Sequence, residues 1–452
     1  MTTETQAIAA IRFGTGLGAD QPPDGPGALI AQFSRRDPAL AEQAPDLAAR
    51  ATMLVEHDAA RALRKEQTQA GERAVKAADR KLRRTTTWDM RMHFARAVGS
   101  PLGFRERLAA FWTDHFTVEA TGRMRTLLVP DLIRTAIRPH VGGRFGDMLA
   151  DTVRHPAMLH YLNQNRSVGP NSRAGQRRGL GLNENLAREV LELHTLGVEG
   201  AYIQADVLGL AQLFTGMTLR ERGFHFAPNW AEPGAETVLG RSYGGAEPAA
   251  WPEIRAALDD LAVHPDTARH LATKLIVHFV GAPAAPDYVA KIARAYLNAG
   301  GRLVPAYRAL LEDDRAWNPT LAKAKTPFDF IVSGLRALKV DAGLLSRAKR
   351  RDLNGQILGP MAAMGQPLMR PAGPDGWPED PRAWITPAGL AARVDWAGRS
   401  ARRWGAETDP REFLQAALGP LAPPLLSRAA GGSETRAEGV ALVLAAPAFN
   451  RR

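Results

Sequence analysis

The stretch between Pro45 and Gly99 is the longest part of the chain that is nearly free of helix-breaking residues. It contains no proline and a single glycine, Gly71. Its apolar residues repeat at helical spacing, so it predicts one or two long helices with Gly71 as the weakest point. The run Gly99-Ser100-Pro101 supplies the stop signal. A chain built around such a stretch is expected to be mainly helical.

Helical spacing also dominates the rest of the chain, and one stretch has a β-like pattern. Phe224 to Phe226 are expected to pair with Thr237 to Leu239 across a turn rich in proline and glycine. We therefore predict an all-α fold with a small β-hairpin near 222–242. The composition does not shift along the 452 residues, so one continuous domain over 1–452 is expected, with 245–250 as the alternative point of division.

The charge of the chain is basic and unevenly distributed. The net charge is +11, and from Arg61 to Arg84 there are nine Lys or Arg against three Asp or Glu. This pattern is typical of a solvated basic helix, and it also fits an anionic partner. No aromatic residue is interleaved with the charges before Trp88, which argues against nucleic acid.

The composition excludes several kinds of site and bears on the expected compartment. The chain has no cysteine, which excludes disulfides, thiolate metal sites and cysteine nucleophiles. No run of about 18 apolar residues is present, so no transmembrane helix is expected. Glu4 precedes any basic residue and no long apolar core follows, so the start does not resemble a secretory signal and predicts a cytoplasmic protein. No cofactor-binding fingerprint is found, and no cofactor is predicted.

The segment "GLNENLAREVLELHTLGVEG", from Gly181 to Gly200, is the richest in polar groups. On a helical wheel the residues from Glu184 to Thr195 form an amphipathic helix, with His194 among the apolar residues. The polar face is formed by Glu184, Asn185, Arg188, Glu189, Glu192 and Thr195.

Two interpretations of this helix stay open. In the structural one, Asn183 caps the helix, Arg188 pairs with Glu184 and Glu192, and Gly197 ends it. In the functional one, Glu189 and Glu192 share a proton or bind a divalent cation, and Arg188 anchors an anionic ligand. No Glu-x-x-His pair is found elsewhere in the chain, so a metal site is not predicted, and a cation at the two glutamates is kept as an alternative.

Further candidate residues lie outside this helix. His115 follows Trp112 and Asp114 within one helical turn, where it is either a base or a satisfied core histidine. With Arg188, Glu189 and Glu192 it completes the candidate catalytic set. The segment 166–178 is basic and directly precedes the helix, and the segment 361–386 is a long loop that holds large side chains. The candidate ligand-binding residues are Asn183, Glu184, Asn185, Thr195, Arg177, Arg178, Gln366, Arg370 and Trp377.

Several stretches together carry a resemblance to a known family. "NENLAREVLELHTLGVEG" followed by "LAQLFTGMTL" resembles the signature of the bacterial family called domain of unknown function 1800. "FWTDHFTVEA", "KTPFDFIVSGLRAL", "MGQPLMRPAGPDGWPEDPRAWIT" and "LAAPAFNRR" agree with that family in the same order. The chain has Met217 where the family pattern Thr-Gly-Trp has tryptophan.

The resemblance implies more about context than about chemistry. Many relatives are exported, so a periplasmic or exported location is the alternative to the cytoplasm. Relatives often lie beside genes for a second uncharacterised family with an alkaline-phosphatase-like outline, which suggests a protein partner. It implies no established activity.

Three functions therefore remain in view. The first is a scaffold or partner-binding protein built around a buried polar helix motif at 183–197. The second is an enzyme that uses the face of Arg188, Glu189 and Glu192. The third is a binder of an anionic polymer through the basic segments 61–84 and 166–178. Oligomeric state is left open.

Overall fold

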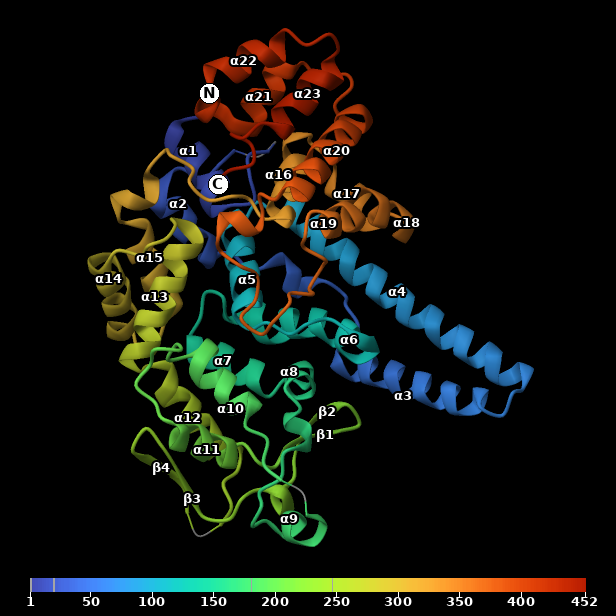
Figure 1. Ribbon diagram of the computed structural model, residues 1–452, viewed down its shortest axis with the longest axis vertical. Helices are drawn as coiled ribbons and strands as arrows, with labels where there is room; N and C mark the ends of the chain where they lie inside the picture. The colour runs from blue at the N-terminus through green and yellow to red at the C-terminus, as the bar shows by residue number, and fades with distance from the viewer. Residues whose placement is uncertain (1, 19–20, 180, 246) are drawn as a thin grey trace.

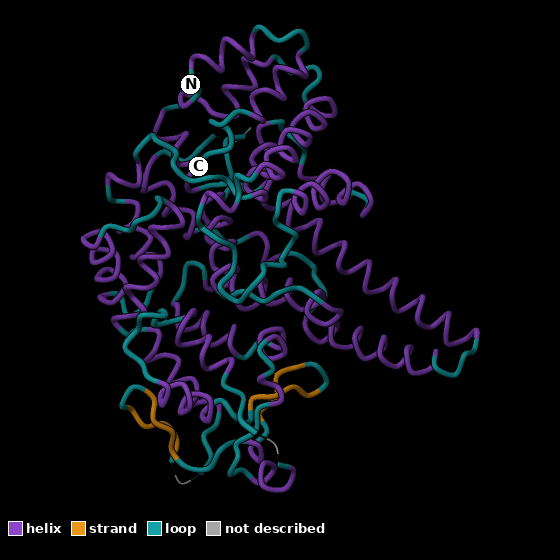
Figure 2. Tube along the Cα trace, in the orientation of Figure 1, coloured by secondary structure: helices purple, strands orange, loops and turns teal. Residues whose placement is uncertain are grey.

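A computed structural model describes residues 2–18, 21–179, 181–245 and 247–452. Helices make up most of the described chain, and the strands form two small antiparallel sheets (Figures 1 and 2). The predicted all-α class with a small β-hairpin is therefore confirmed.

The stretch before Gly99 folds as a long helical hairpin that projects from the body of the molecule (Figure 1). Its helices are α3 (Leu47–Arg64) and α4 (Gln69–Gly99). The chain turns at 65–68, and Thr68 caps α4 by accepting a hydrogen bond from the amide of Gly71 at 3.1 Å. Gly71 does not interrupt the helix. It is buried, and a Cβ there would lie 2.7 Å from the carbonyl oxygen of Leu63, so the glycine lets the two helices approach.

A first cluster of buried apolar side chains extends along the chain from Ile8 to Ala316. Helix α5 (Gly103–His115) lies in it, and Phe104, Leu108 and Trp112 are completely buried at helical spacing. The other helices of this part of the chain are α1 (Glu4–Ile8), α2 (Gly25–Ala31), α6 (Gly122–Leu132), α7 (Phe145–Val153), α8 (Pro156–Tyr161), α9 (Arg173–Arg178), α10 (Asn185–Glu189), α11 (Gln204–Leu213), α12 (Trp251–Ala262), α13 (Pro265–Phe279), α14 (Pro286–Asn298) and α15 (Leu303–Leu311).

A second cluster joins the C-terminal helices to the first helix and to the end of α4. It includes Trp396, whose ring packs edge to face on Phe330. The helices after residue 320 are α16 (Pro327–Ala337), α17 (Ala342–Arg347), α18 (Arg350–Leu353), α19 (Gly359–Ala363), α20 (Pro387–Trp404), α21 (Pro410–Leu418), α22 (Pro424–Gly431) and α23 (Arg436–Ala445). The division at 245–250 stays a prediction. The last residue of the first cluster is Ala316, and all later buried apolar residues of the two clusters, from Phe330 on, belong to the second cluster.

The strands form two hairpins, and the predicted pairing partners are wrong. Strand β1 (Met217–Arg220) pairs with β2 (Gly223–Phe226), and β3 (Ala235–Val238) pairs with β4 (Arg241–Gly244). Phe224 therefore faces Leu219 and not the segment 237–239. Very short turns join the strands of each hairpin, and local pairing needs less loop closure than pairing across the longer proline-rich turn.

Among the described residues, no helix has both the length and the apolar character needed to cross a membrane.

Candidate functional site

The helix that carries the polar motif consists of two parts. Helix α10 ends at Glu189 and continues as a π-helical turn, Val190–His194. The Asn183 side chain accepts a hydrogen bond from the amide of Asn185 at 2.9 Å, which explains the start of the helix. The wider turn rotates the residues after it, so Thr195 is fully buried and its hydroxyl donates to the carbonyl of Val190 at 2.6 Å. Thr195 therefore does not lie on the polar face that a regular helix would give it.

The charged side chains of the polar face pair with one another and with α11. Arg188 donates to Glu184 at 3.1 Å, to Glu192 at 3.2 Å and to Gln204 of α11 at 2.9 Å. The Arg188 side chain is 39% exposed and those of Glu184 and Glu192 are 34% and 26% exposed. The expected burial of this network is therefore wrong, because the motif lies at the surface and its ion pairs are satisfied there.

Glu189 differs from its neighbours. It is half-buried, and among the described residues it has no hydrogen bond or ion pair. Burial raises the pKa of Glu189, and the negative charges of Glu192 and Asp375 raise it further. No group of three or more His, Asp or Glu side chains in the described chain is arranged to hold a metal ion. A divalent cation at Glu189 and Glu192 thus stays an untested alternative.

His115 lies beneath the motif, not beside Arg188. Its ring is buried against Trp112 and Phe116, and its Nε2 donates to the carbonyl oxygen of His194 at 3.1 Å. His270 of α13 donates in the same way to the carbonyl of Leu193 at 3.1 Å. Carbonyls at a helix end lack partners within the helix, so two imidazoles from α5 and α13 satisfy the end of the motif helix.

These histidines are held neutral. Burial, together with the nearby cation Lys274, lowers the pKa of His194 to about 3 and that of His270 to about 4. Burial also places the pKa of His115 well below its ordinary value. The arrangement therefore favours an anchoring role for His115 over proton transfer.

The other candidate ligand-binding residues lie in different places. Arg177 is exposed, and the side chain of Arg178 lies outside the described residues. Arg370 is also exposed, whereas Gln366 is 8% exposed and its Oε1 accepts from the amide of Phe328 at 2.7 Å. Within the described chain, no hydrogen bond or ion pair joins Arg177, Arg370 or Gln366 to the polar face of the motif helix.

The long loop, 361–386, packs on α5 at Asp114, which is not among the ligand-binding residues predicted from the sequence. The amide of Trp377 donates to Asp114 Oδ1 at 2.9 Å. Burial raises the pKa of Asp114 to about 7, against the lowering by that hydrogen bond. Gly376 lies against the same carboxylate, since a Cβ there would be 2.7 Å from Asp114 Oδ1. Asp114, Gln366 and Trp377 all line a cavity between α4, α5, α6 and the loop.

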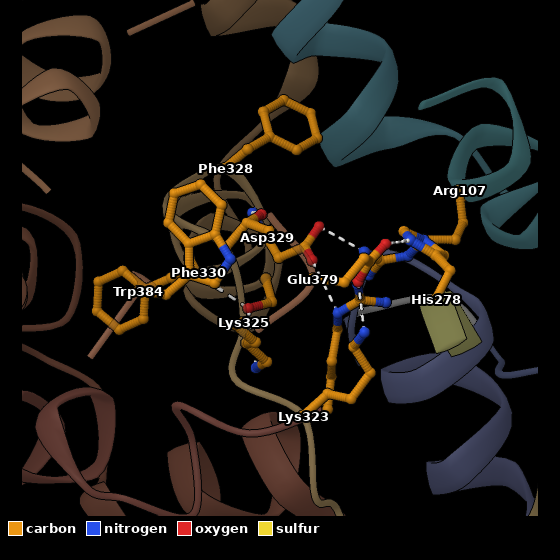
Figure 3. A network of polar contacts seen from close by, with 12 residues as sticks. Arg107, His278, Lys323, Lys325, Phe328, Asp329, Phe330, Glu379 and Trp384 are labelled. Carbon is orange, nitrogen blue, oxygen red and sulfur yellow. Dashed lines mark hydrogen bonds and ion pairs between the residues drawn. The ribbon is translucent and has the colours of Figure 1, made fainter. Parts of the chain in front are cut away.

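A buried charge network joins α5, α16 and the last residue of the chain (Figure 3). The carboxylate of Asp329 forms ion pairs with Arg107 at 2.5 Å and with Arg452 at 3.2 Å. Burial raises the pKa of Asp329, but the two arginines outweigh it and hold the pKa at about 2.

Glu379 anchors the end of the long loop to this network. It pairs with His278 at 2.5 Å and with Lys323. These residues are scattered over the sequence and form no local motif, so the pattern analysis missed them.

The outer side of α4 carries charges without internal partners. Five exposed Arg and Lys side chains share one face of this helix, and none of them forms an ion pair within the described chain. We call this set the basic stripe; it consists of Arg73, Lys76, Arg80, Arg83 and Arg84. The segment around α9 lies on a different part of the molecule (Figure 1), so the two basic segments do not form one surface.

The comparisons with known proteins identify a family and no individual relative. No curated protein matches the chain, and no solved structure matches it. The family model described as "Protein of unknown function (DUF1800)" matches residues 13–451, nearly the whole chain. The resemblance carried by the motif helix and the later segments is thereby confirmed, and the chain belongs to the DUF1800 family.

Proposed function

We propose that this is a partner-binding protein whose helical hairpin docks, through the basic stripe of α4, on the acidic face of a second protein. The observation that carries the proposal is the absence of ion pairs from all five cations of the stripe in the described chain. The motif helix, by contrast, satisfies its charges internally.

The stripe is a continuous surface. At about 100° per residue, Arg73, Lys76, Arg80, Arg83 and Arg84 fall within an arc of about 100° on α4. They extend over about 16 Å of helix axis. Gly71, Val75 and Leu82 are buried on the opposite side, against α3. The cations therefore point away from the hairpin's own packing and are available to a partner.

The hairpin is held firmly enough to present this surface. At its base the buried Arg50 pairs with Asp89 at 2.7 Å and donates to the carbonyl of Leu127 at 2.7 Å. Further out, His57 contacts Asp79 at 3.0 Å. A fixed array of charges loses less conformational freedom on binding than a mobile one.

The surroundings of the stripe favour a folded protein over a nucleic acid. No aromatic side chain lies among the cations to stack on bases. The hairpin also exposes apolar side chains on its other helix, where Val55 of α3 is 50% exposed and Leu63 is 38% exposed, and apolar area of this kind is found in protein interfaces. The family resemblance adds a candidate partner, the second protein encoded beside many relatives.

The test measures complex formation with the purified product of the adjacent gene, by light scattering and calorimetry. The variant Arg73→Glu/Lys76→Glu/Arg80→Glu reverses the stripe. The control Arg294→Glu/Arg402→Glu/Arg428→Glu makes the same change of charge at exposed sites away from the hairpin. We expect the stripe variant to lose about tenfold or more in affinity, and added salt to weaken the wild-type complex.

Two results would contradict the proposal. Equal losses in the stripe variant and the control would show that only net charge matters. A complex that neither variant nor salt affects would place the interface elsewhere. Binding of duplex DNA with the same dependence on the stripe would favour the anionic-polymer alternative.

A further inference from the structure

We propose that the cavity beside α5 binds a small, neutral, mainly apolar molecule, about the size of a substituted benzene, that carries one hydroxyl or carbonyl group. This ligand site is independent of the partner-binding surface on the hairpin.

The cavity has room for such a molecule. Its volume is about 150 Å³. A cavity of about that size is known to hold benzene in another protein. It follows α5 from Glu106 to Asp114, which spans about 12 Å of helix. The small side chains of Ala109 and Ala110 leave this space, and Ala110 is exposed within it.

The wall is mainly apolar. Its apolar side chains include Phe116, Val129, Leu132, Ile133, Leu368 and Met369. Such a wall favours hydrocarbon over water, because transferring apolar surface out of water is favourable.

The charged residues of the wall other than Asp114 are already paired with opposite charges within the protein. Arg138 donates to Asp37 at 2.9 Å and to Glu106 at 2.6 Å. Arg96 pairs with Glu42 at 2.5 Å, and Arg107 pairs with Asp329. An anionic ligand would lose its hydration without gaining a free positive charge, so the site suits a neutral molecule over an anion.

Polar groups without partners remain at one end. Neither ring nitrogen of His93 has a hydrogen bond to a described residue, and the Nε2 amide of Gln366 has none either. Both residues contact Phe328: its ring centroid lies 5.2 Å from that of His93, and its amide donates to Gln366. Both residues therefore lie beside Phe328 on the cavity wall.

The chemistry of these groups selects the polar part of the ligand. Burial, with the charges of Arg96 and Arg138, lowers the pKa of His93 to about 3, so its imidazole is neutral and offers one acceptor and one donor. The Gln366 amide donates. A hydroxyl group can donate to the imidazole and accept from the amide, and a carbonyl can accept from either. At the other end of the cavity, Asp114 keeps a second carboxyl oxygen that has no partner in the described chain.

The test uses p-cresol, toluene and benzoate as probes, with binding measured by calorimetry and by ligand-observed NMR. The wild-type protein should bind p-cresol, should bind toluene about tenfold more weakly for lack of the hydroxyl, and should not bind benzoate. Ala110→Leu should fill the cavity and abolish binding of both neutral probes. Ala391→Leu, at an exposed alanine of α20, is the matched control and should leave binding unchanged.

A second variant tests the polar assignment separately from the cavity. His93→Phe keeps an aromatic ring against Phe328 and removes nitrogens that bind nothing else, so folding should be unaffected, which circular dichroism can verify. It should weaken p-cresol to the affinity of toluene without changing toluene itself.

The proposal is overturned if no neutral probe binds the wild-type chain, or if Ala110→Leu binds as well as the control. It is also overturned if benzoate binds more tightly than p-cresol. An unchanged preference for p-cresol in His93→Phe would overturn the assignment of the hydroxyl to His93.

Discussion

Two groups of ion pairs in this protein look similar as contacts and differ in environment. On the motif helix, Arg188 joins Glu184 and Glu192 at the surface, where its side chain is 39% exposed. In the buried network, Asp329 joins Arg107 and Arg452, whose side chains are 6% and 2% exposed. Water screens the first group and hardly reaches the second, so the same geometry has different energetic consequences.

The difference shows where charge holds the fold together. Arg107 belongs to α5, Asp329 to α16, and Arg452 follows the last helix, so one carboxylate connects distant parts of the chain. The partners on the motif helix are four residues apart and connect only neighbouring turns, with Gln204 as the one contact from another helix. The buried network should therefore dominate stability, and the motif face should contribute little.

Asp329→Asn should produce the largest effect. It keeps the shape of the side chain and removes the charge that compensates two buried arginines. Breaking such a pair costs about 3–5 kcal/mol, because Arg107 stays buried without its carboxylate and Arg452 keeps only the longer contact with Glu379 at 3.9 Å. Urea unfolding followed by circular dichroism measures the loss.

The matched control for this change is Asp395→Asn. Asp395 pairs with Arg399 at 2.7 Å but is 62% exposed, so its loss should cost less than about 1 kcal/mol. Similar losses in both variants would remove the distinction between buried and surface pairs.

Lys325 allows a test of the buried network by pH. Burial lowers the pKa of Lys325 from an ordinary value near 10.5 to about 7. Its ammonium group lies 3.0 Å from the Ser333 hydroxyl and 3.8 Å from the centre of the Phe449 ring. Between pH 7 and 10.5 the unfolded chain keeps a proton that the folded lysine has lost. Stability from this group therefore rises as the pH increases through that window.

Lys325→Met should remove this dependence. We expect the variant to be more stable than the wild type at pH 7, by about 1–4 kcal/mol, and the difference to shrink towards pH 10. Unfolding curves at several pH values give the comparison. Parallel pH profiles for the two proteins would show that Lys325 does not titrate in this range.

The contrast also explains what could be predicted from the sequence. The helices α3, α4 and α5 follow from local spacing and from stop signals such as Gly99-Ser100-Pro101, and the pairs of Arg188 follow from a four-residue separation. The π-helical turn at Val190–His194 could not be foreseen, because it depends on carbonyl partners, His115 and His270, that tertiary packing supplies.

The network around Asp329 and the cavity beside Asp114 depend in the same way on long-range packing. Each assembles residues from segments hundreds of positions apart. Periodicity carries no signal for such contacts, and only the family resemblance linked these segments in advance.

The smallest expected effect concerns the motif helix itself. Arg188→Ala removes two pairs of the kind that contribute a few tenths of a kcal/mol each, so stability should fall by less than about 1 kcal/mol. The same unfolding assay measures it, with Arg308→Ala as a control, since Arg308 also forms an exposed pair with a glutamate four residues away.

A loss above about 2 kcal/mol would show that the motif face is structural in spite of its exposure. If stability is unchanged but the complex with the partner weakens, the motif extends the binding surface beyond the hairpin. If stability and binding are both unchanged, the polar face of the motif remains available for the enzymatic alternative, with the unpaired Glu189 as its next residue to vary.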